Sequence, residues 1–410
     1  MIALPGHNCV CLQVLQISSV LKYALALIFL LSGLLAIYLA NQYGVGITGD
    51  SLYYLRISRD FQLNGLLTIL DSPAAGPKPP LYPIVLSLFN DNALVLNLLG
   101  FTVTYLLSAW WAGCWLKNAF YYIVFCGLMG LGTPVILVHV FVWTEPLFMP
   151  LMLLFYFLLY KALIEKKWYW FLLAGVLAST MCAIRYAGIL VFASVIVGML
   201  VGGKVSRKYM LLIGLLGILF FLIWFGLAPE NLIWRVKLAL TPYTEGRVYW
   251  YGRNVVAFLE GFGLWFLPLN LPFILRIVFS LAWLALTGYA VKKLSKVGKE
   301  GVLRILLISF LSYYLMLHLV YLIEYYTVER YLLPFYPAVI LGILYFVQEQ
   351  RLGVSLKYIA LAACLIVVGY NSVRTAKNVK MWHEVRKANK ADTIENLPED
   401  YYKVFDEAAK

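Results

Sequence analysis

Residues Leu21–Ala40 read LKYALALIFLLSGLLAIYLA, and this first apolar run decides the fold class. A helix of about 20 apolar residues is long enough to cross the hydrocarbon core of a bilayer. No small-residue cleavage site follows the run, and it is long for the apolar region of a signal peptide. We therefore expect a transmembrane helix that is retained as an anchor.

The composition extends this expectation to the whole chain. Hydrophobic residues make up 63% of the 410 residues, charged residues make up only 13%, and the mean hydropathy is +0.83. Soluble proteins carry about 25% charged residues, so an ordinary soluble protein is excluded. The net charge of +13 is concentrated in short loops between apolar runs, which indicates membrane orientation rather than nucleic-acid binding.

Further apolar runs predict an all-α polytopic bundle of about eleven transmembrane helices. After Leu21–Ala40, the predicted spans are Ala93–Trp115, Ala119–Val138, Pro146–Leu163, Trp168–Ala183, Ala187–Val201, Tyr209–Leu227, Leu264–Ala290, Leu303–Ile323, Leu332–Val347 and Ser355–Tyr370. Residues 1–370 then form one membrane domain, with outer loops at 41–92 and 228–263. Residues 371–410 form a short soluble tail.

Basic clusters in three loops predict the orientation, because lysine and arginine favour cytoplasmic loops. The clusters are Lys161, Lys166 and Lys167; Lys204, Arg207 and Lys208; and Lys292, Lys293, Lys296, Lys299 and Arg304. Counting crossings from them places Asp50, Lys78, Glu145, Arg185 and Arg330 on the outer side. The same count puts the basic segment 374–380 outside, against this bias, although long soluble tails can translocate regardless of charge.

The segment Ile47–Arg59, ITGDSLYYLRISR, places an acid, paired tyrosines and two arginines directly after the first span. Transfer from a lipid phosphate needs a carboxylate near an acceptor hydroxyl, and cations beside the departing phosphate. Asp50 can supply the carboxylate, and Lys78, Arg185 and Arg330 can supply the cations. The sequence contains no glycine-rich nucleotide cradle. Its cysteines and histidines form no zinc pattern.

Each of these candidates also has a structural explanation. A carboxylate can cap a helix, as Asp50 could, or stabilise the first turn, as Glu145 could. A cation can stay solvated, as Lys78 could, or extend to the membrane interface, as Arg185 could. Arg330 could pair locally with a neighbouring glutamate. The sequence leaves these alternatives open.

Five short motifs, taken together, resemble those of the GT-C integral-membrane glycosyltransferases. They are Gly49–Tyr54 with Arg59, Lys78–Pro83, Thr144–Phe148, Ile184–Gly188 and Glu329–Pro337, in that order. The closest group contains the protein O-mannosyltransferases and the lipid A aminoarabinose transferase. The resemblance runs from Leu21 to about Gln348, and it implies a GT-C-like bundle.

The resemblance implies an inverting sugar transfer from a polyprenyl-phosphate donor to a lipid, glycan or protein acceptor. The reaction would take place on the outer side of the plasma (inner) membrane. Asp50 matches the family's general base and Lys78 matches its phosphate-binding lysine, but Ser51 stands where the family often has a second acid. Further site candidates from the motifs are Tyr54, Arg59, Tyr82, Glu145, Tyr186, Glu329 and Tyr331. No metal ligand is assigned, and assistance by a divalent metal stays open.

The alternative from another class is a multi-span transporter or lipid flippase. A transporter is expected to hold ionisable groups near the bilayer midplane in paired broken helices. Here the candidate groups are predicted to gather at one surface, and this contrast favours an enzyme.

Overall fold

The computed structural model describes residues 19–65, 79–202, 205–227, 255–261, 263–267, 271–320, 328–349 and 354–388. Within these ranges the chain is 86% helix without a β-strand, which confirms the all-helical prediction. By length and composition, seven helical stretches could cross a membrane: Ser19–Ala40, Ala93–Trp115, Ala119–Val138, Glu145–Glu165, Phe273–Lys293, Gly298–His318 and Arg330–Glu349. The protein is therefore a multi-pass membrane protein in its described part, where fewer than the expected eleven spans are recognised.

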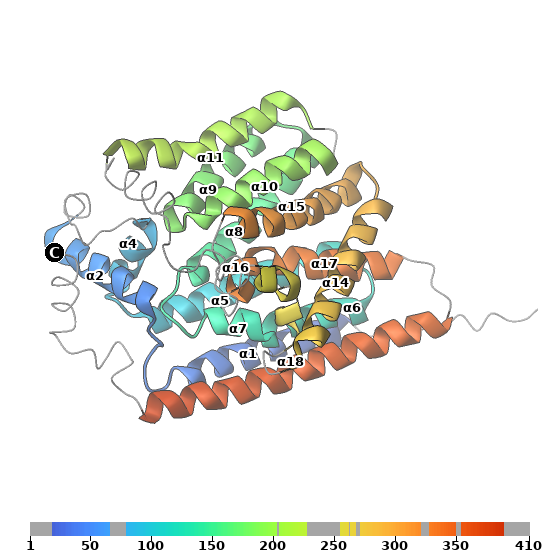
Figure 1. Ribbon diagram of the computed structural model, residues 1–410, viewed down its shortest axis with the longest axis horizontal. Coiled ribbons are helices and arrows are strands. Elements are labelled where there is room, and N and C mark those ends of the chain that lie inside the picture. The colour runs from blue at the N-terminus through green and yellow to red at the C-terminus, as the bar shows by residue number, and fades with distance from the viewer. Residues whose placement is uncertain are drawn as a thin grey trace, which may run out of the picture.

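The helices form a bundle in which neighbours in sequence are often neighbours in space. In chain order they are α1 (Ser19–Ala40), α2 (Gly49–Asn64), α4 (Leu81–Leu88), α5 (Ala93–Trp115), α6 (Ala119–Leu131), α7 (Thr133–Val138), α8 (Glu145–Glu165), α9 (Trp168–Ile184), α10 (Ala187–Gly202), α11 (Arg207–Leu227), α14 (Phe273–Lys293), α15 (Gly298–Val320), α16 (Val328–Leu332), α17 (Tyr336–Glu349) and α18 (Val354–Ala388). Figure 1 shows α1 beside α18 along one edge and α9 beside α11 along the opposite edge. The short helices α2 and α4 pack together at one end.

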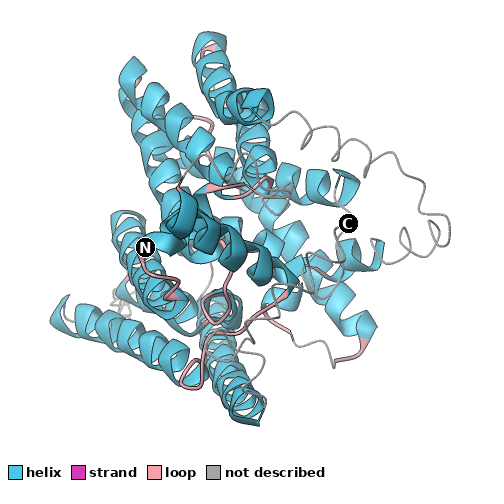
Figure 2. Cartoon of the chain, turned by 90° about the vertical axis from the view of Figure 1, so that its left-hand side faces the viewer, coloured by secondary structure: helices cyan, strands magenta, loops and turns pink. Residues whose placement is uncertain are grey.

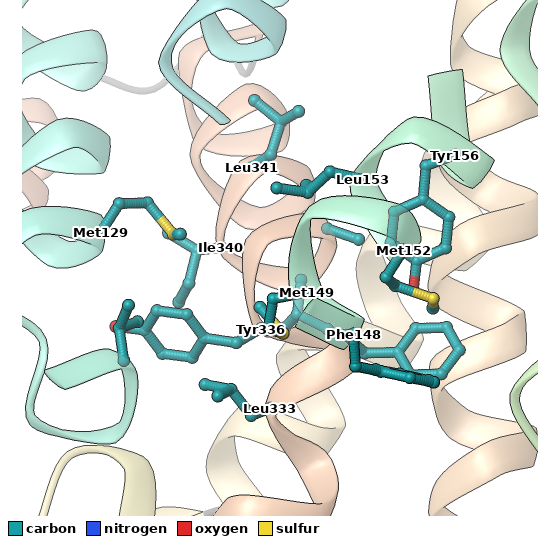
Figure 3. Close-up of a cluster of buried hydrophobic side chains, with 14 of the residues drawn as sticks. Met129, Phe148, Met149, Met152, Leu153, Tyr156, Leu333, Tyr336, Ile340 and Leu341 are labelled. Carbon is teal, nitrogen blue, oxygen red and sulfur yellow. The ribbon is translucent and has the colours of Figure 1, made fainter. Parts of the chain in front are cut away.

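The apolar core extends through most helices of the bundle, and one cluster of it lies among α6, α8 and α17. Figure 3 shows Met129, Phe148 and Ile340 among the side chains buried there. Close approach of α5 to the beginning of α8 depends on Gly100, because a Cβ atom at this position would collide with the carbonyl of Pro146. This approach holds the first turn of α8 inside the bundle.

The two largest departures from the predicted spans are at α14 and α18. The span predicted at Leu264–Ala290 starts later, because α14 begins at Phe273, directly after Pro272. Proline lacks a backbone donor and favours a helix start over a helix interior. Residues Gly263–Trp265 instead form a separate 3₁₀ turn, η2.

The last helix also continues past the position where the final span was predicted to end. α18 runs without a break through Tyr370 to Ala388, and Asn371, Thr375 and Arg386 are buried along it. The predicted boundary between membrane domain and soluble tail therefore does not coincide with a helix end. Residues 389–410 and most of the predicted outer loop 228–263 lie outside the described residues.

The two ends of the bundle carry different charges. Figure 2 views the bundle from the end that carries α2 and α4. α8 starts at this end with Glu145, and α9 arrives at this end just before Arg185. The predicted basic loops lie at the other end, about 30 Å away along α8. Asp50, Glu145, Arg185 and Arg330 therefore lie at one end, while the outward orientation of that end stays a prediction from loop charge.

Candidate functional site

Four charged side chains from distant parts of the sequence meet at this end. They are Asp50 of α2, Glu145 of α8, Arg185 between α9 and α10, and Arg330 of α16, and we call them the charge cluster. Nε of Arg330 donates a hydrogen bond to Oε1 of Glu145 at 2.6 Å, and Nη1 of Arg185 donates to the same oxygen. Nη1 of Arg330 lies 3.4 Å from Oδ2 of Asp50. Two positive and two negative side chains therefore balance one another.

The members of the cluster differ in their access to solvent. Glu145 has no exposed surface, and Arg185 and Arg330 are buried. The side chain of Asp50 is 37% exposed. A buried charge costs several kcal/mol unless it is paired, so mutual pairing is what keeps three of these groups inside the bundle. Asp50 is the member that an incoming molecule can reach.

Asp50 is held by a small network at the beginning of α2. The backbone N–H of Thr48 donates to Oγ of Ser51 at 2.9 Å, and Ser51 donates to the carbonyl of Val142 at 2.9 Å. The indole N–H of Trp143 donates to Oγ1 of Thr48, also at 2.9 Å. These bonds fasten the first turn of α2 to the segment that precedes α8. The backbone that carries Asp50 is therefore fastened on both sides of this residue.

The structural alternative for Asp50 as a helix cap does not hold. α2 begins at Gly49, and Thr48 occupies the N-cap position. Asp50 lies inside the first turn, where the helix dipole favours a negative charge. Its side chain faces Arg330 instead of capping a helix that starts at Ser51.

Glu145 lies at a helix start and also belongs to the charge cluster. It is the first residue of α8, where a carboxylate is favoured by the helix dipole. It also accepts hydrogen bonds from both buried arginines. The pairing of Arg330 with Glu145 and Asp50 is long-range in sequence; the side chain of Glu329, the local partner considered, lies outside the described residues.

Aromatic rings support both arginines of the charge cluster. The guanidinium of Arg330 lies 4.0 Å from the ring centroid of Trp143. The guanidinium of Arg185 lies 4.5 Å from the ring centroid of Tyr331. A cation over an aromatic face is stabilised electrostatically. The N–H groups at the edge of the guanidinium stay available for hydrogen bonds to other partners. Tyr331 therefore lies against the charge cluster.

Tyr54 and Tyr82 form the side of the site nearest to α2 and α4. Their rings meet edge to face with centroids 5.0 Å apart. Burial, and secondly the negative charge of Asp50, raises the pKa of Tyr54 above its ordinary value. Burial likewise raises the pKa of Tyr82. Both hydroxyls therefore stay protonated at neutral pH. The buried hydroxyl of Tyr82 makes no hydrogen bond to any described residue.

The remaining candidates are Arg59, Tyr186 and Lys78. Arg59 is exposed on α2, about 13 Å along the helix from Asp50. Burial raises the pKa of the Asp91 carboxyl group. The positive charge of Arg59 lies close enough to Asp91 to oppose this rise. Tyr186 is half-buried in the turn between α9 and α10. Lys78, the predicted phosphate ligand, lies outside the described residues.

Sequence reasoning missed Thr48 and Trp143, which position Asp50 and Arg330. The available signal was their position in the sequence, since Thr48 directly precedes the motif Gly49–Tyr54 and Trp143 directly precedes the motif Thr144–Phe148. Within the described ranges, no group of three or more His, Cys, Asp or Glu side chains could hold a metal ion.

Comparison of the sequence with protein-family models and with curated proteins found no match. The fold and the site define a multi-pass helical membrane protein with a compensated, mostly buried charge cluster at one end. Its resemblance to the GT-C enzymes rests on the motifs alone.

Proposed function

We propose that the charge cluster is the catalytic centre of a GT-C-type glycosyltransferase. The enzyme moves a sugar from a polyprenyl-phosphate donor to a lipid, glycan or protein acceptor, at the outer face of the plasma (inner) membrane. The observation that carries the proposal is the partly exposed carboxylate of Asp50 beside the buried guanidinium of Arg330 at one end of the bundle. This pair brings a base and a cation to one place.

Asp50 acts as the general base in this proposal. Its contact with Arg330 favours the carboxylate form, which can accept a proton. Asp50 takes the proton of the acceptor hydroxyl while the acceptor oxygen attacks the anomeric carbon of the sugar. The bond between that carbon and the phosphate oxygen breaks, and its electron pair leaves with the polyprenyl phosphate. Attack opposite the departing phosphate inverts the anomeric centre.

Arg185 and Arg330 stabilise the negative charge that grows on the departing phosphate. Each guanidinium carries five N–H donors, and the contacts with Glu145 and Asp50 engage only part of them. Because Glu145 already compensates the arginines, they remain in place before a donor arrives. Tyr82 offers a further buried hydroxyl next to the same charges.

The position of the cluster favours an enzyme over a transporter or flippase. Glu145 is the first residue of α8, and Arg185 directly follows the last residue of α9. A transporter is expected to bind its substrate near the bilayer midplane, between broken helices. The charge cluster lies instead at helix ends.

The proposal is tested with purified protein and a polyprenyl-phosphate-linked labelled sugar. In detergent, where no ion gradient exists, the protein should release free polyprenyl phosphate as it transfers the label to an acceptor. Movement of an intact substrate across sealed vesicles, with the glycosyl–phosphate bond never broken, would support the transporter instead.

A further inference from the structure

A groove between α1 and α18 is separate in its residues from the charge cluster. It encloses about 460 Å³, and both helices contribute to its walls. Leu35 and Leu39 of α1 face Ala376 and Val379 of α18 across it. Figure 1 shows the two helices running side by side along the outer edge of the bundle.

The groove is apolar along its length and cationic at one end. Lys380 and His383 lie at the end that also contains Leu39, near the last residue of α1. The α1 side of the groove faces the membrane, since Leu31 and Leu35 are more than half exposed on a predicted span. From Ser32 to Leu39 the groove extends about 10 Å. One leaflet contributes about 15 Å of hydrocarbon, so the groove matches the upper part of one lipid chain.

The cation at the end of the groove is only weakly neutralised. Nζ of Lys380 lies 3.8 Å from Oε1 of Glu384, and both side chains are mostly exposed. Exposed ion pairs contribute little, so an anionic group can displace this carboxylate. Nδ1 of His383 donates a hydrogen bond to the carbonyl of Leu39 at 3.0 Å, and its ring packs on Tyr43. These contacts hold the histidine at the end of the groove.

The orientation predicted from loop charge does not explain why basic residues occur here. Lysines close to a span favour the cytoplasmic side. Yet Lys380 lies near the end of α1 that leads into α2, the same end as Asp50. Binding of an anionic ligand would explain why the basic segment 374–380 lies at this end.

We propose that the groove binds a phospholipid with an anionic headgroup from the surrounding bilayer. One acyl chain lies between α1 and α18, and the phosphate lies at Lys380 and His383. Apolar walls and a cation at the depth of the headgroups are the two features that such a lipid complements. The inference is independent of the reaction proposed for the charge cluster.

Photolabelling of the purified full chain tests this site. The probe is phosphatidylglycerol with a photoreactive group in its acyl chain, and labelled peptides are identified by mass spectrometry. Label is expected in residues 31–40 and 372–383. Unlabelled phosphatidylglycerol should compete and phosphatidylcholine should not.

Matched variants separate a specific site from general surface charge. Lys380→Gln should weaken labelling about fivefold, as expected for the loss of one cation at the membrane surface. Glu384→Gln removes the competing carboxylate and should leave labelling equal or stronger. Lys387→Gln, exposed about two turns beyond Lys380 on α18 and outside the groove, should change it less than about twofold. Ala376→Trp should block the groove and abolish the label.

Three results would overturn the proposal. The first is equal competition by phosphatidylcholine, which would remove the headgroup preference. The second is unchanged labelling in both Lys380→Gln and Ala376→Trp. The third is displacement of phosphatidylglycerol by equimolar polyprenyl phosphate, which would assign the groove to the donor lipid instead.

Discussion

Arg330 and Glu145 share a hydrogen bond of 2.6 Å between Nε and Oε1, although 185 residues separate them in the chain. Both residues are buried, and the bond ties α16 to the first turn of α8. Arg330 also reaches Asp50 on α2. A single guanidinium thus connects three helices at the place where the proposed reaction occurs.

Glu145→Gln should destabilise the protein, because it leaves Arg185 and Arg330 buried with less compensating charge. Removing one partner from a buried ion pair costs about 3–5 kcal/mol. Thermal unfolding of the purified protein in detergent measures the effect. The matched control is Glu165→Gln at the opposite end of α8, where the carboxylate is much more accessible and pairs with Lys161. Equal unfolding midpoints for the two variants would contradict this role of Glu145.

Replacement of the arginines should weaken donor binding in a graded way. Arg330→Ala removes the charge, while Arg330→Lys keeps it without the planar fork that reaches both Glu145 and Asp50. Affinity for polyprenyl phosphate should therefore fall from wild type to lysine to alanine, and Arg185→Ala should also weaken it. Arg276→Lys is the control, since Arg276 pairs with Glu260 outside the cluster. Full affinity in both alanine variants would exclude the arginines as phosphate ligands.

Arg386→Gln should destabilise the segments that precede α2 and α8, which Arg386 joins. Its Nη1 bonds Oδ1 of Asn41 at 2.7 Å, and its Nη2 bonds the carbonyl of Val140 at 2.6 Å. A buried acceptor that loses its donor costs about 1–3 kcal/mol. Hydrogen exchange should therefore accelerate in residues 41–65. Lys387→Gln, exposed next to it, is the control, and equal exchange in both variants would show that Arg386 does not support this segment.

Cysteine labelling tests the orientation predicted from loop charge. In a background without native cysteines, Asn64→Cys at the exposed end of α2 should react with an impermeant reagent added to intact cells. Lys296→Cys, in the loop after α14, should react only after the membrane is opened. The reverse pattern would place the charge cluster on the cytoplasmic side.

The sequence predicted the ends of helices that are set by local residues, such as an apolar run or a capping side chain. α5 spans Ala93–Trp115, as expected from its apolar run, and the side chain of Asn92 caps it through the N–H of Val95. Alternation of spans also placed Asp50, Arg185 and Arg330 at one end. The end of α18 was missed because a helix that packs on another helix needs no apolar residue at every position.

The internal geometry of the site depends on packing that no local pattern records. Glu145 lies between two arginines because α8 approaches α5 at Gly100 and meets the turn after α9. Trp143 and Arg386 occur near helix ends, where aromatic and basic residues are common at any membrane interface. Only the folded structure shows which interfacial aromatic and basic residues support the site and which do not.

The central claim is that Asp50 is the base of a glycosyl transfer. The most direct measurement is the rate at which purified wild type, Asp50→Asn and Asp60→Asn release polyprenyl phosphate from a lipid-linked labelled sugar. Asp60 lies on the same helix and outside the charge cluster, so its variant controls for loss of an acid on α2. We predict that Asp50→Asn lowers the rate about 10²- to 10⁴-fold while donor binding and folding persist, and that Asp60→Asn stays close to wild type. Near-normal release by Asp50→Asn, or no release by wild type with any acceptor, would contradict the account.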